Sequence, residues 1–155
     1  MGASEWTIGP VADAAELVAA SGLFDSPVTQ CGARAFLEMP GHHLLLARST
    51  DGTALGFVSG VLMRHPDKDA EMFVHELGVD GGFRRRGIAT ALLRALAALG
   101  QGLGCTGMWT GTERANAAAL ATYRSLGAVV DAESVFVAWD SLGASFATLK
   151  APDKP

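Results

Sequence analysis

The sequence predicts a single domain of the mixed α/β (α+β) class, in which a mixed sheet carries helices on its faces. Strand-type segments with an apolar period of two alternate with segments of helical period, in the order β-α-α-β-β-β-α-β-α-β-β. No internal repeat and no Pro/Gly/Ser-rich linker divides residues 1–155. That length is enough for one hydrophobic core of its own.

The first part of the chain is predicted to contain a short strand and two helices. Trp6–Ile8 is strand-like, and a helix is expected from Pro10, which suits a first helical position, with Gly22 near its end. A second helix is predicted within residues 26–40, with Ser26 as its N-cap.

Three strands are predicted in the centre of the chain. Residues 42–49 and 54–64 are apolar β-type runs joined by Thr-Asp-Gly-Thr, which predicts a hairpin. Residues 70–79 follow the polar loop HPDKDA as a third strand. Gly78 lies inside this strand and predicts a β-bulge, the alternative being that it ends the strand.

The apolar period becomes helical after Gly87. An amphipathic helix is predicted from the spacing of Ile88, Leu92, Leu93, Leu96 and Leu99. A strand is predicted at residues 105–112, followed by an alanine-rich helix at 114–127 that Gly127 ends. A strand pair around a turn is predicted at residues 128–131 and 134–140, and a frayed polar tail at 150–155.

Composition limits the classes of partner. The formal net charge is −4 and the isoelectric point about 5.5, which argues against nucleic acid as the default partner. Cys31 and Cys105 are too few for a disulfide framework or a zinc site. Neither a membrane-length apolar run nor a signal-peptide pattern is present. We therefore expect a cytoplasmic protein without a metal or a membrane partner.

The sequence Arg84-Arg85-Arg86-Gly87 lies between a predicted strand and a predicted helix. The first amides of a helix lack internal partners and lie at the positive end of the helix dipole, so this position suits a phosphate. Gly87 lets an anion approach the backbone closely, and the small Ala89 keeps the next turn open. The alternative is an ordinary solvated charge run.

The context of this motif resembles the GNAT superfamily of N-acetyltransferases. The cofactor motif of that family, Arg/Gln-x-x-Gly-x-Gly/Ala, matches Arg84, Gly87 and Ala89. Its later motif, an Asn that opens a helix followed by a Tyr and a Leu-Gly end, matches Asn116, Tyr123 and Leu126–Gly127. The resemblance is strongest between residues 71 and 127.

The resemblance implies a GNAT fold of about seven strands and about four helices, with the sheet splayed between strands 4 and 5. It also implies acetyl-CoA as cosubstrate, with its pyrophosphate on the amides of residues 85–90 and its pantetheine arm along the backbone of residues 77–79. The implied cofactor-binding residues are Leu77, Gly78, Val79, Arg84, Arg85, Arg86, Gly87, Ile88, Ala89, Thr90, Asn116 and Tyr123.

Two residues are the candidates for proton transfer. Glu76 precedes the expected bulge, where a carboxylate can accept a proton from an amine; the alternative is an edge-strand carboxylate in solvent. Tyr123 lies seven residues after Asn116, so both share one helix face, and its phenol would take the general-acid role of the family. The alternatives are a core tyrosine and a capping asparagine.

Other conspicuous residues are expected to be structural. His75 should point to the opposite face of the sheet from Glu76, because side chains alternate along a strand. His42 and His43 are expected to open a strand. Met108 and Trp109 are expected to lie in the core rather than to form a substrate platform.

The acceptor is predicted from a narrower resemblance. The pieces SGLFDSPV, PGHHLLLA, HELGV and RRRGIATALL look like small aminoglycoside 3-N-acetyltransferases, which implies antibiotic resistance. A cationic acceptor calls for carboxylates, for which the candidates are Asp25, Glu71, Glu76 and Glu113. A polyamine, another small metabolite, a protein N-terminus and a non-catalytic acyl-CoA-binding module remain alternatives. A homodimer is also expected.

Overall fold

The structure is a computed structural model that describes residues 5–139 and 141–143. Its strands are β1 (Trp6–Pro10), β2 (His42–Ser49), β3 (Ala54–Met63), β4 (Ala70–Val79) and β5 (Cys105–Trp109). Its helices are α1 (Ala14–Ala19), α2 (Gln30–Glu38), α3 (Ile88–Gly102) and α4 (Ala117–Ser125), with short 3-10 turns η1 (Ser21–Leu23) and η2 (Gly81–Phe83).

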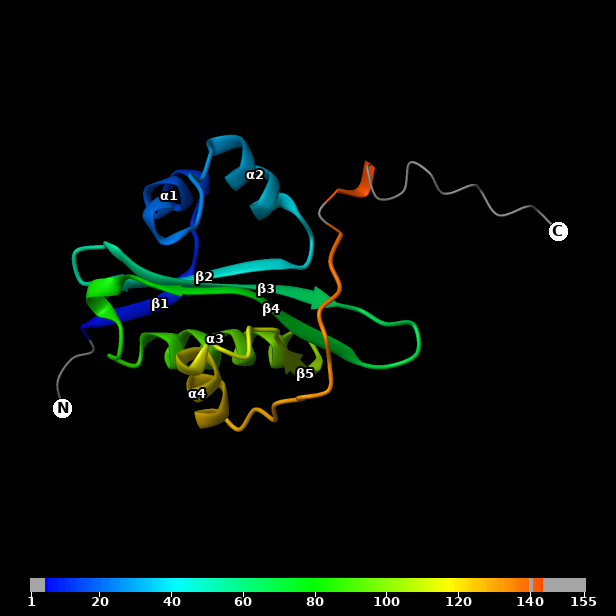
Figure 1. The fold of residues 1–155 in the computed structure, drawn as a ribbon. Helices are drawn as coiled ribbons and strands as arrows, with labels where there is room; N and C mark the ends of the chain where they lie inside the picture. Colours follow the sequence, from blue (N-terminus) through cyan, green and yellow to red (C-terminus); the bar gives the residue numbers. More distant parts are fainter. Residues whose placement is uncertain (1–4, 140, 144–155) are drawn as a thin grey trace.

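The strands form one sheet in the order β1-β2-β3-β4-β5. Neighbouring strands are antiparallel except β4 and β5, which run parallel. Figure 1 shows α1 and α2 on one face of the sheet and α3 and α4 on the other. The predicted mixed sheet with helices on its faces is therefore confirmed. The expected number of about seven strands is wrong, because the described residues contain five.

A separate hydrophobic core fills each side of the sheet. On one side, α3 buries Leu92 and Leu96 completely against β2, β3 and β4. On the other side, Leu17 of α1 and Ala33 of α2 pack over Leu46 and neighbouring sheet residues. The two cores fix which face of the sheet each strand residue occupies. Of the helices described, none combines the length and apolarity that a membrane crossing needs.

The first two helices begin later than the sequence indicated. Pro10 is the last residue of β1, where it pairs with Leu45, and not the first residue of a helix. Asp13 caps α1 by accepting a hydrogen bond from the amide of Glu16 at 2.9 Å. Thr29, and not Ser26, caps α2. Proline is tolerated on an edge strand, so it predicted the wrong element here.

The last predicted strand pair is wrong as far as the structure describes it. Residues 128–131 and 134–139 form no strand, and Val135 is 83% exposed. The chain instead crosses the end of β5, where the ring of Phe136 lies directly against Gly111. Figure 1 shows this segment passing from the α4 side of the sheet to the α2 side. Its alternating apolar pattern resembles a strand, but no neighbouring strand pairs with it. The predicted frayed tail at residues 150–155 lies outside the described residues.

The strands β4 and β5 part halfway along β4. They are paired only from Ala70 to Phe73, opposite Cys105 to Trp109. The rest of β4, from Val74 to Val79, is paired with β3 alone. This separation agrees with the splay that the family resemblance implies.

Candidate functional site

The loop after β4 presents free backbone amides at the start of a long helix. Gly87 is the N-cap of α3 with φ 82°, in the left-handed region that favours glycine, and no side chain caps this end. The first internal hydrogen bond is the one from Ala91 to the carbonyl of Gly87, at 3.0 Å. No acidic residue lies in the first turn. The amides of residues 88–90 can therefore bind an anion, as the motif predicts.

The three arginines of this loop have different surroundings. Arg84 donates its Nε hydrogen to the carbonyl of Val79 at 3.3 Å. The guanidinium of Arg86 lies 5.1 Å from the ring centre of Phe83, and its Nη1 is 3.7 Å from a carboxylate oxygen of Glu5. Arg85 has φ 61°. The side chains of Arg84 and Arg86 thus contact the loop and its neighbours, which supports an auxiliary role for them in anion binding.

The bulge in β4 lies at His75 and not at Gly78. Glu76 is paired with Ser59 and Val74 with Gly60, so His75 is the extra residue. Gly78 has a different reason to be glycine: a Cβ there would lie 2.7 Å from Cε1 of Phe57. The prediction of a bulge in this strand was correct in kind but misplaced, because a glycine can also reflect close packing.

The bulge brings His75 and Glu76 to the same face of the sheet. Val74 and Leu77 both pack on the α3 side, so the two residues between them lie on the α1/α2 side. Nδ1 of His75 is 3.9 Å from Oε2 of Glu76, and both side chains are exposed. The expectation that they point to opposite faces is therefore wrong.

Two hydroxyl groups lie near Glu76 on the sheet, one of them buried and the other partly buried. Ser59, its partner on β3, is 1% exposed, and its Oγ has no hydrogen-bond partner among the described residues. The hydroxyl of Thr110, just after β5, donates to the carbonyl of Val74 at 2.9 Å. Thr110 therefore bridges the two strands at the point where they part. No pattern in the sequence marks either residue.

The helix α4 carries the two later motif residues. Asn116 caps α4 by accepting a hydrogen bond from the amide of Ala119 at 3.1 Å, so the capping role is confirmed. Gly127, with φ 86°, ends the helix in a Schellman arrangement, in which the amide of Ala128 donates to the carbonyl of Tyr123 at 3.1 Å. The predicted helix end is thus confirmed.

Tyr123 is half-buried on the α3 side of the sheet. Burial raises the pKa of its phenol, and a hydrogen bond with the Thr110 hydroxyl partly offsets this. Because Thr110 also binds Val74, Tyr123 lies near the parting of β4 and β5. Glu76 lies near the same point on the opposite face of the sheet. The two candidate proton-transfer residues therefore flank the opening between the strands.

The four predicted substrate carboxylates are spread over the surface. Glu71 binds Lys68 at 3.0 Å and His65 at 3.1 Å, and the hydrogen bond from Lys68 is the main cause that lowers its pKa. Asp25 follows η1, and Glu113 precedes α4. Glu71 and Glu76 are both on β4, with the bulge between them.

Three further predictions concern residues near the sheet. His42 and His43 are the first residues of β2, as expected. Met108 and Trp109 are 40% and 43% exposed, so the prediction that they lie in the core is wrong. Both residues are on β5, which is at the edge of the sheet, so no further strand covers their outer side. Within the described ranges, no cluster of three or more His, Cys, Asp or Glu side chains could hold a metal ion.

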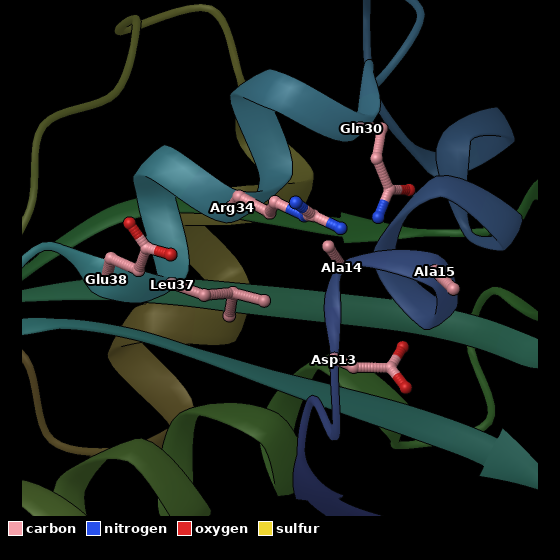
Figure 2. A pocket seen from close by; sticks show the side chains of 7 residues that line it. All are labelled: Asp13, Ala14, Ala15, Gln30, Arg34, Leu37 and Glu38. Carbon is pink, nitrogen blue, oxygen red and sulfur yellow. The ribbon is translucent and has the colours of Figure 1, made fainter.

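Two hollows lie outside the opening between β4 and β5. One of about 450 Å³ lies between the start of α1 and α2, and Figure 2 shows Arg34 of α2 reaching across it toward Ala14. None of the predicted site residues lines it. The other, of about 390 Å³, lies beside the arginine loop and includes Trp6, Phe83 and Arg86 in its lining.

The comparison with known protein families decides the assignment. Residues 15–128 match the acetyltransferase (GNAT) family, and this range contains the arginine loop, β4 and α4. The chain belongs to the GNAT acetyltransferase family.

Relatives of this GNAT chain include two curated proteins named mycothiol acetyltransferase, from Mycobacterium avium (strain 104) and Mycolicibacterium paratuberculosis (strain ATCC BAA-968 / K-10). Each is 39% identical over an alignment of 103 residues that covers 61% of this chain and 32% of the relative. The aligned part of the GNAT chain thus spans about a third of the length of these relatives.

Solved structures show the same GNAT fold. An aminoglycoside acetyltransferase from an uncultured soil metagenomic sample, in complex with sisomicin, has a TM-score of 0.79 at 15% identity over 88% of this chain and 97% of that one. AAC(6')-Iy, in complex with the bisubstrate analogue CoA-S-monomethyl-acetylneamine, has a TM-score of 0.73 at 20% identity over 89% of this chain and 100% of that one. At these identities the likeness concerns the fold.

Proposed function

We propose that this chain transfers the acetyl group of acetyl-CoA to a primary amine, most favourably the 3-amino group of an aminoglycoside. The observation that carries the proposal is the opening between β4 and β5, flanked by Glu76 on one face and Tyr123 on the other. The family match supports the reaction class. The likeness to aminoglycoside acetyltransferases supports an aminoglycoside as the acceptor, and the narrower sequence resemblance alone supports its 3-amino group.

The residues around the opening fit acetyl-CoA. The uncapped amides of residues 88–90, together with Gly87, would hold the pyrophosphate, and Arg85 would add charge beside it. The edge of β4 from Leu77 to Val79 is not paired with β5, so its backbone is available to the pantetheine arm. Bound acetyl-CoA supplies an activated acyl group whose leaving group is a thiolate.

Glu76 would accept the proton that the acceptor amine loses as its nitrogen forms the new bond to the acetyl carbon. Tyr123 would donate its phenolic proton to the departing sulfur. The raised pKa of Tyr123 keeps this phenol protonated at neutral pH, as a general acid requires. The bulge at His75 supports this assignment, because it turns the exposed side chain of Glu76 away from the α3 core and toward the α1/α2 side of the sheet.

Release of free thiol from acetyl-CoA in the presence of kanamycin or gentamicin tests the proposal. We expect Glu76→Gln and Tyr123→Phe each to lower kcat by roughly 10²-fold or more while CoA binding, measured by calorimetry, is unchanged. Glu133→Gln, an exposed carboxylate outside the proposed site, is the matched control and should have wild-type activity. Unchanged turnover in both site variants would refute the residue assignments.

A second candidate acceptor is the amine used by mycothiol acetyltransferases. The 39% identity over 103 residues favours it, although this region is only 32% of those proteins. Including that amine in the same thiol-release assay separates the two candidates by their kcat/KM values. Tight CoA binding without thiol release for any amine would instead favour a non-catalytic acyl-CoA-binding module. Cytoplasmic location and a homodimer remain part of the proposal, and size-exclusion chromatography with light scattering tests the latter.

A further inference from the structure

Four residues form a row across the face of the sheet that carries α1 and α2. His42, Val61, Phe73 and Trp109 are each paired with the next across the strands β2 to β5. The helix α2 covers the start of this row, where the ring of Phe36 meets His42 edge-on at 5.5 Å. The other end is open, because Trp109 is 43% exposed. The row therefore changes from packed core to accessible surface.

The open end of the row is aromatic. The ring centres of Phe73 and Trp109 are 4.5 Å apart with 37° between the ring planes, and the ring of His75 is 5.8 Å from that of Phe73. We call Phe73, His75 and Trp109 the aromatic ledge. It ends where β4 and β5 part, and Glu76 is the next residue of β4 on the same face.

Carboxylates lie on both sides of the aromatic ledge along β4. Glu76 follows it, and Glu71 precedes it on the same face, opposite Met63. Glu71 is already bound to Lys68 and His65, so Glu76 is the carboxylate left for a cationic ligand. The faces of aromatic rings carry negative charge density and attract ammonium groups and polarised C–H groups. Such a surface suits a ring with an apolar face and an attached amine.

We propose that the aromatic ledge binds the ring of the acceptor, which selects amines carried on a saturated, sugar-like ring over linear amines. This inference rests on the proposed function, because it places the acceptor amine beside Glu76. The rings of Phe73 and Trp109 pack against each other with a 37° tilt, and Trp109 supplies the exposed part of this apolar surface. A linear polyamine would gain little from an aromatic surface of this kind, because it has no ring to stack there and binds through charge along its length.

The segment 134–139 leaves the aromatic ledge accessible. Phe136 lies against Gly111, two residues beyond Trp109, and is itself 77% exposed. Trp109 is 43% exposed beside this segment. The described residues therefore leave part of its ring accessible to a ligand.

The variant Trp109→Ala tests the proposal, with Trp109→Phe as the conservative variant and Met108→Ala as the matched control. Met108 is the preceding residue, has nearly the same exposed fraction, and is paired with the buried Met72 on the other face of the sheet. For each protein, calorimetry with CoA present gives the Kd of kanamycin and of spermine. Thiol release gives the KM of each amine and of acetyl-CoA, and thermal denaturation gives the Tm.

We expect Trp109→Ala to weaken kanamycin binding by about tenfold or more, while the spermine Kd and the acetyl-CoA KM change by less than about twofold. Trp109→Phe should retain most of the kanamycin affinity, and Met108→Ala all of it. If the wild-type protein binds kanamycin without releasing thiol, and Trp109→Ala loses that binding, the proposed acetyl transfer is refuted. The proposal that the aromatic ledge binds the acceptor ring is then still supported.

Two results would overturn the proposal for the aromatic ledge. The first is equal kanamycin affinity in Trp109→Ala and wild type, with or without turnover; a lowered Tm beside it would mean that Trp109 packs under the segment 134–139 in solution. The second is a wild-type protein that binds spermine as well as kanamycin, or binds neither. Thiol release with any of these results leaves the proposed function intact.

Discussion

Ser59 lies directly opposite Glu76 in the β3–β4 ladder, and its buried hydroxyl has no hydrogen-bond partner among the described residues. A buried hydroxyl without a partner costs about 1–3 kcal/mol relative to one in water. We therefore expect Ser59→Ala to raise the free energy of unfolding by about 1 kcal/mol, or the Tm by roughly 2–4 °C. Urea denaturation measures the difference.

The control for Ser59→Ala is Ser49→Ala. The hydroxyl of Ser49 is exposed and bonded to Asp51 and to the carbonyl of Thr53, so its removal should lower stability slightly or leave it unchanged. A lower Tm for Ser59→Ala would show that the Ser59 hydroxyl is hydrogen-bonded in solution, and a lower kcat would make it part of the path for the proton.

Gly87→Val should abolish cofactor binding, because valine cannot adopt φ 82° without strain and its side chain would cover the amides that face the anion. Gly104→Val is the matched control: Gly104 has φ 87° and open space around it, but lies after the other end of α3. Both variants should lose comparable stability, by about 1–3 kcal/mol. Only Gly87→Val should lose CoA affinity in calorimetry, and an equal loss in both would contradict the loop assignment.

Gly78→Ala should destabilise the protein by about 1–3 kcal/mol, because the added Cβ would lie 2.7 Å from the ring of Phe57 and 3.3 Å from the carbonyl of Leu23. The smaller Phe57→Leu should reduce the cost of the alanine when the two changes are combined. A double-mutant cycle in urea measures the coupling. Additive effects of the two changes would mean that the ring of Phe57 is not what requires glycine at this position.

Glu16→Gln should lower stability at neutral pH and leave it unchanged in acid. The hydrogen bond from Arg48 lowers the pKa of Glu16 below the ordinary 4.5, and the carboxylate also accepts from the amide of Ala12 at 2.7 Å. A lowered carboxyl pKa stabilises the fold above the unfolded pKa, and this stabilisation is lost as the pH falls through the folded pKa.

The difference in the free energy of unfolding between wild type and Glu16→Gln should therefore have its full value at pH 7, about 1–2 kcal/mol after solvent screening. It should become smaller below about pH 4.5. Denaturation at pH 7, 5, 4 and 3 measures it. Glu38→Gln, a single exposed carboxylate at the end of α2, controls for the loss of one charge. A constant difference at all four pH values would exclude the ion pair as its source.

The sequence predicted those elements whose signal is local and repeated. The strands β2 and β4 have the predicted bounds because a turn or a polar loop lies at their ends, and α3 begins after Gly87 because a helical apolar period follows it. The arginine loop was equally predictable, since a glycine before a helix places free amides next to one another in the chain.

Three features that the sequence did not show depend on contacts between segments. A one-residue bulge at His75 changes the face of every later side chain in β4, but depends on the pairing with β3 rather than on the residue type. The contact of Tyr123 with Thr110 joins segments from different elements. The segment 134–139 has the alternation of a strand but lies where no partner strand runs, which its own sequence cannot show.

The bulge in β4 divides one strand between two tasks that can diverge separately. Before it, Phe73 belongs to the aromatic ledge proposed for the acceptor; after it, Leu77 to Val79 belong to the edge proposed for acetyl-CoA. On this proposal, a substitution upstream of His75 would change which amine is accepted without altering how the acyl donor is held. In a protein lineage, such an arrangement would let one donor site serve a succession of acceptors.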